Sequence, residues 1–501
     1  MSGTTARARV ERLTGFDTAG EPFISGDRVL RGIYHGHAAK VHEVLRICER
    51  EKLFDHGIVS TRELADNPHP EIPYEMVLEH RRLPFVSYPH EWSGSMFKDA
   101  ALFHIQLFER LEKHGLTLKD WHPYNILFDS TNPVFVDFTS IIRIVDLPSQ
   151  PHLRRARAPR GMSGRWDQTS LAIYEMYRGM YEPYFGLPLA MMHRRRHAVA
   201  RRRVFETTLN AADSVITRRE AFEGDLAGRL RYELDEQVLR NLLARRGPVK
   251  PRFFAAVRRA ASRQRAALEP SAYSSYYEDK NEAFSPEPSA RWTAKQHGVH
   301  NALRGFSPGT VLDLGSNTGW FSMLAARLGS SVVAVDLDEA SIDRLYSTAK
   351  REHLSILSLV ANLTTALPEL APKTFEDEPS QSLLGEAPPL IRSATSRLRC
   401  DMVLALAIVH HLALGQGLLF AEIASILGAL ADKYLCVEFV DIDDAMITDD
   451  PDFFPAWKAS PGAFAWYARD GFVRELRRHF GTIEVVPSHP GSRSLLVCSK
   501  Q

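Results

Sequence analysis

Residues 311–336, VLDLGSNTGWFSMLAARLGSSVVAVD, decide how the C-terminal half of this chain folds. An apolar run over residues 310–314 is short enough for a buried strand, and residues 332–335 form a second such run. Between them, the apolar spacing of residues 320–328 predicts a helix packed on a sheet. We therefore predict a strand, a glycine turn, a helix and a second strand that stops on Asp336. This order is the first half of a nucleotide-binding α/β unit.

The glycine turn distinguishes between two kinds of nucleotide. In the dinucleotide fingerprint GxGxxG, Asn317 would stand at the second glycine, so a pyrophosphate would lose its closest backbone approach. Asp313 instead places a carboxylate two residues before Gly315, where it suits the ammonium group of S-adenosylmethionine. Asp336 can hold both ribose hydroxyls. The turn therefore favours S-adenosylmethionine over NAD, and the structural alternative is an α/β unit that has lost its ligand.

The stretch resembles motif I of class I S-adenosylmethionine-dependent methyltransferases. Together with LALAIVHHL at 404–412 and CVEF at 436–439, it is similar to a bacterial group that includes nodulation-protein-type methyltransferases. The resemblance covers roughly the last 210 residues and implies an α/β domain with a seven-stranded Rossmann-like sheet that ends in an antiparallel hairpin. It assigns the cofactor S-adenosyl-L-methionine to Asp313, Gly315, Ser316, Asn317, Gly319, Asp336, Asn362 and Ala407. Asp313 would serve its amino-acid end and Asn362 its adenine amino group.

The rest of this half supplies the remaining elements. We predict strands at 356–360, 402–407 and 434–437, a closing hairpin at 482–486 and 494–498, and helices at 290–303, 339–351 and 464–480. Residues 368–399 are rich in proline, serine and charge, so we interpret them as an excursion between strands that can act as a lid over the cofactor.

Two residues near strand ends are candidates for catalysis. His410 follows the strand at 402–407, and carboxyl ends of strands face the ligand crevice in such sheets. Its imidazole titrates near neutral pH, which suits a substrate contact or a general base. A histidine that only packs at the strand end is the alternative. Glu438, with acidic residues at 441, 443 and 444, could orient a hydroxyl or a metal, or form a solvated loop.

The N-terminal part carries a second pattern. Residues 118–128 read LKDWHPYNILF and residues 133–138 read PVFVDF. This pattern resembles the catalytic loop of protein-kinase-like and aminoglycoside-phosphotransferase-like enzymes, and it implies an α+β kinase-like domain. By that resemblance Asp120 would accept the substrate hydroxyl proton, while Asn125 and Asp137 would bind magnesium with ATP. Before it we predict an edge strand at 28–34, a helix at 40–53, a strand at 76–79 and a helix at 100–114.

The kinase pattern is incomplete. Thr139 replaces the glycine that follows Asp-Phe, no glycine-rich loop has the right spacing, and Lys40 lies in a helical pattern, not in a strand. The region before the loop is also short for a full N-terminal lobe. Three interpretations stay open: a degenerate kinase-like domain that binds substrate or supports the enzyme, an active kinase, and a chance loop.

Composition and charge narrow the class of protein. A chain of 501 residues is too long for one hydrophobic core, so several domains are expected. We place a kinase-like domain at 1–185, a helical, arginine-rich extension and linker at 186–288, and a methyltransferase domain at 289–501. A helix predicted at 168–181 leads into the extension. The net charge of +1 gives no global reason for nucleic acid as a partner. The arginines of 194–196 and 201–203 are interpreted as a solvated helix face or a surface for an acidic or phosphorylated glycan.

Cysteine usage and hydropathy complete the frame. The 4 cysteines are scattered without a CxxC pair, so neither a disulfide framework nor a zinc site is expected, and Cys436 and Cys498 are expected in the core. There is no signal-peptide-like start and no run of eighteen apolar residues, so we expect a cytoplasmic protein without a membrane span. The sequence does not indicate an oligomeric state.

Three functions fit these patterns. The first is a methyltransferase that transfers methyl to an oxygen or nitrogen of an unidentified small-molecule or saccharide acceptor, with a bacterial glycan or its phosphate as the candidate. The second is a bifunctional kinase and methyltransferase that modifies a saccharide. The third is a nonenzymatic scaffold with a cofactor-binding domain.

Overall fold

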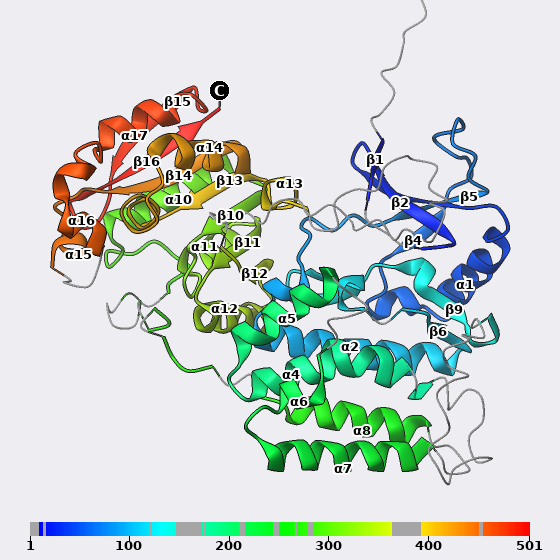
Figure 1. The fold of residues 1–501 in the computed structure, drawn as a ribbon. Coiled ribbons are helices and arrows are strands. Elements are labelled where there is room, and N and C mark those ends of the chain that lie inside the picture. The colour runs from blue at the N-terminus through cyan, green and yellow to red at the C-terminus, as the bar shows by residue number, and fades with distance from the viewer. Residues whose placement is uncertain are drawn as a thin grey trace, which may run out of the picture. The chain divides into compact units, whose positions relative to one another are not determined.

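The computed structural model describes residues 10–13, 17–120, 122–146, 173–174, 176–209, 216–243, 250–265, 268–271, 273–275, 277, 282, 284–362, 392–449 and 454–500. These residues form two compact units (Figure 1). The first is built from the described residues of Met1–Leu83 and Ser87–Ala267, and the second from those of Pro84–Val86, Leu268–Pro368 and Arg392–Gln501.

The first unit begins with a five-stranded antiparallel sheet. Its strands are β1 (Val10–Arg12), β2 (Gly20–Ser25), β3 (Arg28–Ile33), β4 (Thr61–Glu63) and β5 (Met76–His80), in the order β1-β2-β3-β5-β4. The prediction that residues 28–34 form an edge strand is wrong, because β3 lies between β2 and β5. Its last four residues are all buried, so both of its faces are covered.

Two helices, one short hairpin and one further strand pair make up the region around the kinase-like motif. Helix α1 (Ala38–Arg50) and helix α2 (Gly94–Lys113) confirm the two predicted helices. Strand β6 (Leu116–Leu118) pairs with β9 (Ile141–Arg143), and β7 (Ile126–Asp129) pairs with β8 (Asn132–Phe135). The segment with Asp120 therefore lies between β6 and β7, and Asp137 lies between β8 and β9.

The helical stretch after residue 176 belongs to the first unit. It comprises a π-helix (Tyr177–Gly186), α4 (Leu187–His193), α5 (His197–Leu209), α6 (Arg218–Ala221), α7 (Leu226–Leu243) and α8 (Lys250–Arg263). Helix α8 packs on α2, with the rings of Phe108 and Phe254 5.2 Å apart and an Arg258–Glu109 ion pair of 2.7 Å. The two compact units divide the chain between Ala267 and Leu268, and the domain boundaries at 185 and 288 stay predictions. Of the helix predicted at 168–181, residues 173–174 and 176 are helical and the π-helix begins at Tyr177, while residues 168–172 and 175 lie outside the described part of the chain.

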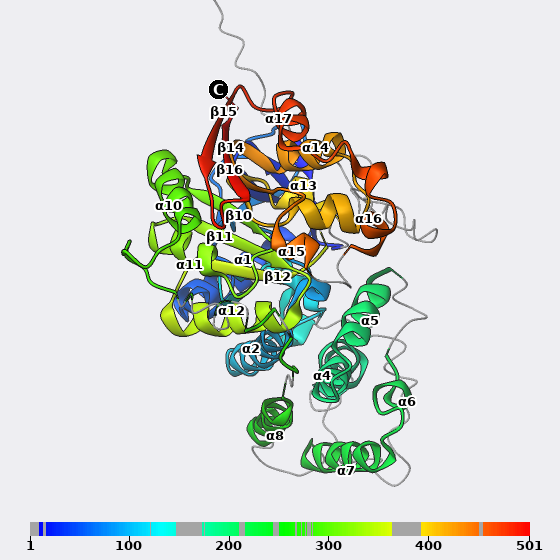
Figure 2. The ribbon, with the colours of Figure 1, turned by 90° about the vertical axis from the view of Figure 1, so that its left-hand side faces the viewer.

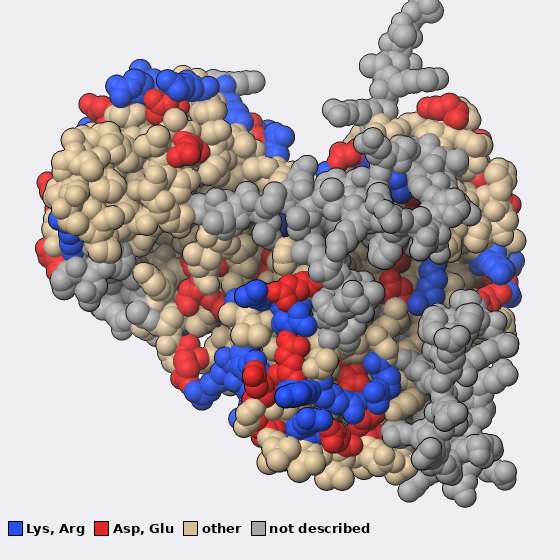
Figure 3. Space-filling view, viewed as in Figure 1, with Lys and Arg blue, Asp and Glu red and all other residues tan. Residues whose placement is uncertain are grey.

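The arginine runs on these helices are largely neutralised within the unit. Arg194 pairs with Asp225 at 2.8 Å, Arg196 with Glu223 at 3.1 Å, and Arg203 with Glu220 at 2.6 Å. In Figure 3, basic and acidic side chains alternate over the surface that these helices present. This alternation favours the helix-face interpretation over a surface for an anionic glycan.

The second unit is a seven-stranded mixed sheet. Its strands are β10 (Thr310–Leu314), β11 (Ser331–Asp336), β12 (Ile356–Val360), β13 (Cys400–Ala405), β14 (Ala431–Val440), β15 (Thr482–Pro487) and β16 (Arg493–Ser499). Their order is β12-β11-β10-β13-β14-β16-β15. The first five are parallel, while β16 is antiparallel to both β14 and β15. The predicted Rossmann-like sheet with a closing hairpin is confirmed, and Cys436 and Cys498 are buried in it.

Helices cover both faces of this sheet (Figure 2). On one face, α10 (Ala294–Phe306), α11 (Trp320–Arg327) and α12 (Glu339–Glu352) bury Val299, Leu324 and Leu345 in one core cluster. On the other face, α14 (Phe420–Leu430) and α17 (Arg469–Leu476) pack with Phe439 through Phe420 and Phe472. Short helices α13 (Ala394–Arg397), α15 (Ala445–Thr448) and α16 (Pro455–Ala459) complete the unit.

Two predictions in this unit need comment. The single helix predicted at 464–480 is wrong. A 3-10 turn (Pro461–Phe464) and α17 stand there, separated by Trp466 and Tyr467, whose rings pack against Phe420. Most of the predicted lid lies outside the described residues. None of the helices in the described part of the chain combines the length and apolar content that crossing a bilayer requires.

Acid stability of the first unit should depend on His104. This side chain on α2 is fully buried beside Phe135 and Phe185, and burial lowers its pKa to about 3. An unfolded histidine, with a pKa of about 6.5, binds a proton that the folded one refuses, so folding stability falls as the pH drops from 6.5 toward 3.

We therefore expect His104→Phe to remove about 1.4 kcal/mol per pH unit of this acid loss. Melting of the first unit between pH 6.5 and 4.5 measures it, with the exposed His56→Gln as the matched control. Equal pH dependence of the wild type and the Phe variant would contradict the assignment.

Candidate functional site

The turn between β10 and α11 has alternate residues in the left-handed region. Gly315 has φ +69°, Asn317 +52° and Gly319 +82°. Asparagine is among the few other residues that adopt this conformation readily, so Asn317 keeps the turn without a second glycine. A Cβ on Gly319 would stand 2.3 Å from the Leu345 side chain, so this position also needs glycine for space.

The two predicted carboxylates lie at the ends of neighbouring strands. Asp313 on β10 is buried and accepts a hydrogen bond from Ser322 Oγ at 2.5 Å. Burial, reinforced by the charge of Asp336, raises the pKa of Asp313 to about 6. Asp336 ends β11 and accepts from the backbone N–H groups of Asn317 (2.8 Å) and Asp338 (2.9 Å), and burial raises its pKa as well.

Several features of the turn point to a ligand beside it. Ser316 is buried and its Oγ has no hydrogen-bond partner among the described residues, which is rare unless a ligand or water supplies one. Ala407, at the end of β13, has φ +54°, a strained conformation for alanine of the kind that clusters at functional sites. Ile408 lies against Gly315, so the end of β13 adjoins the turn. The predicted residues Gly315, Ser316 and Ala407 thus come together, and Asn362 follows β12, two strands from β10.

A segment that sequence reasoning left as a linker also reaches this site. The Asn317 Nδ2 donates to the carbonyl of Tyr273 at 2.8 Å, and Arg344 donates to the carbonyl of Ser274 at 2.8 Å. Ser271 Oγ donates to Asp338 Oδ2 at 2.7 Å. These contacts fasten the backbone before α10 to the turn. Its tyrosine- and serine-rich composition was the available signal, but no periodicity pointed to the turn.

His410 occupies a closed position after β13. Its side chain is fully buried, and neither ring nitrogen has a hydrogen-bond partner among the described residues. Burial, together with His411 and the charge of Arg493, lowers its pKa well below the ordinary value. The rings of His411 and Phe454 stand 4.3 and 5.7 Å away. The imidazole is therefore neutral near pH 7 and has an acceptor nitrogen to offer.

Glu438, within β14, and Asp444, which follows that strand, do not lie in a solvated loop. Glu438 is buried, pairs with Lys295 at 2.7 Å and accepts from Ser488 Oγ at 2.5 Å. Asp444 is buried in a two-pronged pair with Arg493, at 2.8 and 3.0 Å. Both carboxylates hold neighbouring elements together, because each has a cation and a hydroxyl already in contact. The alternative of a solvated loop is therefore wrong for these two residues.

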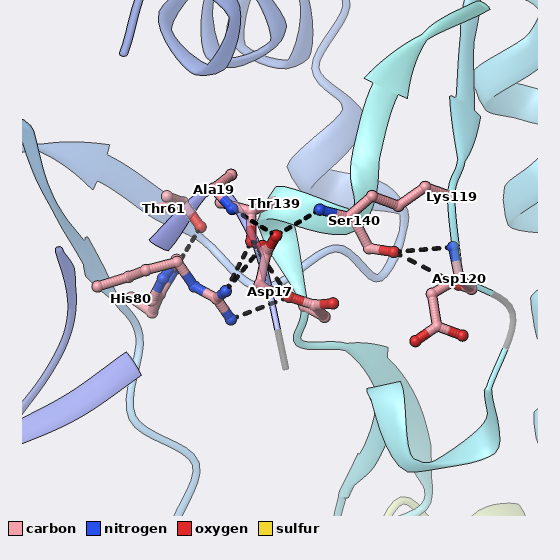
Figure 4. A network of polar contacts seen from close by, with 10 residues as sticks. Asp17, Ala19, Thr61, His80, Lys119, Asp120, Thr139 and Ser140 are labelled. Carbon is pink, nitrogen blue, oxygen red and sulfur yellow. Dashed lines mark hydrogen bonds and ion pairs between the residues drawn. The ribbon is translucent and has the colours of Figure 1, made fainter. Parts of the chain in front are cut away.

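The kinase-like residues of the first unit also converge. Asp120 Oδ1 accepts from the His122 N–H at 3.0 Å, and its backbone N–H donates to Ser140 Oγ at 3.1 Å. The Val136 N–H, next to Asp137, donates to the carbonyl of Asn125 at 2.9 Å. Burial raises the pKa of Asp120. In Figure 4 none of the dashed contacts around Asp17 reaches the Asp120 carboxylate.

Arg31 is the residue of this unit that sequence reasoning missed. It lies on β3, and its guanidinium contacts Asp137 at 2.9 Å and Thr139 Oγ1 at 2.6 Å. In protein kinases a lysine of the third strand contacts the nucleotide phosphates. Position 31 carries an arginine, so a pattern that requires a lysine in this strand does not detect it. Because Arg31 holds Asp137, the carboxylate matched to metal binding already has a cationic partner.

Two comparisons with known sequences bear on this chain. Residues 277–371 match the family model "Tellurite resistance protein TehB". The chain is 26% identical over 439 residues to "Nodulation protein NoeA" of Rhizobium meliloti (strain 1021), covering 86% of this chain and 85% of that protein. The family match spans the turn of residues 315–319, and the relative extends over both units.

Solved structures give weaker likenesses. Magnesium protoporphyrin IX methyltransferase (ChlM) from Synechocystis PCC 6803, with bound SAH, has a TM-score of 0.27 and 16% identity, over 41% of this chain and 81% of that one. The bifunctional kinase-methyltransferase WbdD has a TM-score of 0.30 and 16% identity, over 45% and 42%. TehB from Haemophilus influenzae has a TM-score of 0.27 and 17% identity, over 46% and 67%. The strand order and the family match together confirm the resemblance of the second unit to class I methyltransferases.

Binding of S-adenosylhomocysteine should separate two glycines. Gly319→Ala and Gly329→Ala both place alanine at positive φ, which is unfavourable by about 1–2 kcal/mol. The new Cβ at 319 would meet the Leu345 side chain, whereas a Cβ added at 329 would have no contact within 4 Å among the described residues. We expect calorimetry to show an affinity for S-adenosylhomocysteine that is roughly tenfold or more weaker in Gly319→Ala and unchanged in Gly329→Ala. Equal affinity in both variants would show that the turn does not shape the site.

Proposed function

We propose that the second unit, a class I S-adenosylmethionine-dependent methyltransferase domain, transfers a methyl group to an oxygen or nitrogen nucleophile. The observation that carries this proposal is the left-handed turn of Gly315 and Gly319, flanked by Asp313 and Asp336 at the ends of adjacent strands. Among the described residues, the hydrogen-bond donors to the two carboxylates are neutral, so lone pairs of both remain for a ligand.

The residues fit the cofactor. S-adenosyl-L-methionine, when bound, supplies a sulfonium whose methyl group is highly electrophilic. Asp336 would hold the ribose hydroxyls and Asp313 the amino-acid end, while Asn362 would serve the adenine. The buried Ser316 hydroxyl, without a partner among the described residues, would find one in the ligand. The left-handed turn brings backbone close to it without a Cβ in the way.

We assign His410 the role of orienting the nucleophile. A general base works best when its pKa lies near the working pH. Burial lowers the pKa of His410 well below its ordinary value, so the ring is a poor general base. The neutral ring can accept a hydrogen bond from a hydroxyl or amine and fix a lone pair toward the methyl group. Transfer from a sulfonium depends mainly on in-line positioning and exclusion of water, so a strong base is not required.

For the acceptor we propose a hydroxyl or phosphate of a bacterial glycan. Support comes from the resemblance to the nodulation-protein-type group and from the relative that spans both units. The first unit would then select the saccharide. This choice is separate from the methyl transfer and does not rest on the geometry of the turn.

The bifunctional alternative has one observation in its favour and one against it. The loops that carry Asp120, Asn125 and Asp137 meet, as a phosphotransferase requires. Against it, Arg31 pairs with Asp137, where such enzymes hold a metal ion. A scaffold without catalysis is the third candidate. Detectable release of S-adenosylhomocysteine from S-adenosylmethionine would exclude it.

Release of S-adenosylhomocysteine from S-adenosylmethionine, with a bacterial envelope saccharide fraction as acceptor, tests the proposal. We expect turnover with a 14-Da mass gain on the acceptor, the mass of one CH₂. Asp336→Asn should abolish it, and His410→Ala should lower it roughly 10- to 100-fold. The control Asp432→Asn changes an exposed acid near the amino end of β14 and should leave turnover unchanged.

Absence of turnover with S-adenosylhomocysteine still binding would favour the scaffold. Full turnover in Asp336→Asn would contradict the assigned cofactor site.

A further inference from the structure

Asp17 of the first unit lies where an external anion would be expected. It comes between β1 and β2, and only 5% of its side chain is exposed. Its Oδ1 accepts from Lys119 Nζ at 2.5 Å and from the Ala19 N–H at 2.9 Å. Its Oδ2 contacts Arg31 at 3.3 Å and the Thr139 hydroxyl. Figure 4 shows these groups converging on the one carboxylate.

The groups around Asp17 are the donors that a phosphate group takes in proteins. The Arg31 guanidinium, the Lys119 ammonium, the Thr139 hydroxyl and the Ala19 N–H come from four separate parts of the chain. We call these four groups the cradle. The Arg31 Nε is in addition buried and has no partner among the described residues, so the cradle holds one donor that Asp17 does not use. The cradle therefore has more donor capacity than its carboxylate fills.

The same cradle adjoins the catalytic-loop match. Thr139 Oγ1 stands 3.3 Å from Asp137 Oδ1, and Arg31 contacts both Asp17 and Asp137. A second anion beside Asp17 would meet like charges on both sides, because in the described part of the chain Arg31 and Lys119 offset three acids, Asp17, Asp137 and Asp120. Asp17 and a phosphate group cannot both occupy the cradle.

We propose that Asp17 is an internal occupant of an anion site built by Arg31, Lys119 and Thr139, and that a nucleoside polyphosphate binds the first unit only by displacing this carboxylate. The tethered carboxylate competes at a high effective concentration, which reduces the apparent affinity for any external anion. The described form of the first unit is then the ligand-excluding form. This inference is independent of methyl transfer.

Calorimetric titration of the full-length protein with ATP and Mg²⁺ tests the proposal. Asp17→Asn keeps the shape of the side chain and removes its charge, so we expect ATP to bind roughly tenfold or more tightly than to the wild type. Asp27→Asn, an exposed acid in the turn between β2 and β3, is the matched control and should bind ATP as the wild type does. Pyrophosphate with Mg²⁺ should show the same gain if the phosphates, and not the base, are recognised.

Further variants keep the result decisive. Adding Lys119→Gln to Asp17→Asn should remove the gain, because one cation of the cradle is lost. Asp17→Ser repeats the measurement if the asparagine variant does not fold, and S-adenosylhomocysteine binding reports that the second unit is intact. Equal ATP affinity in the wild type and the charge-removed variants, or no binding in any of them, would overturn the proposal.

Discussion

The second unit depends on one backbone constraint, the left-handed turn that joins β10 to α11. Gly319 must lack a side chain because Leu345 of α12 fills the space beside it. That contact sets how closely α12 approaches the turn, and with it the end of β11, where Asp336 binds the Asn317 N–H. The turn therefore fixes both the packing of the helices on one face and the placement of the two acids.

The two units treat their buried acids in opposite ways. In the second unit, hydroxyl and backbone donors hold Asp313 and Asp336, so the carboxylates keep capacity for a ligand. In the first unit, Arg31 and Lys119 hold Asp17 and Asp137. A paired carboxylate must lose a strong charge-assisted contact before it can take part in metal binding. Metal binding at Asp137 would therefore require a rearrangement of the first unit, whereas a ligand beside Asp313 and Asp336 would require none in the second.

The extent to which the sequence predicts the structure follows from the range of the interactions. Strands such as β10 and β12 have the predicted bounds because each is a short apolar run closed by small or polar residues. The turn of residues 315–319 was predictable because its residues are contiguous. The pairing of Arg31 with Asp137 joins residues more than a hundred positions apart, and no local pattern carries it. The same holds for the attachment of residues 271–274 to the turn and for the position of β3 inside its sheet.

His410 shows a third case. Its place after a strand was predictable from the sequence. Its complete burial, however, depends on Phe454 as well as on the adjacent His411, and no spacing rule connects Phe454 to it. Burial decides the chemistry here, since an exposed imidazole would be a good base near pH 7 and the buried one is a neutral hydrogen-bond acceptor.

The central claim is that the turn of residues 315–319 and the end of β11 bind the cofactor. Titrating the wild-type protein with S-adenosylhomocysteine, with calorimetry and amide hydrogen exchange as the two readouts, tests it most directly. The account predicts one binding site per chain and slowed exchange at the turn of residues 315–319 and at the end of β11. Absence of binding heat, or protection confined to other parts of the chain, would contradict it.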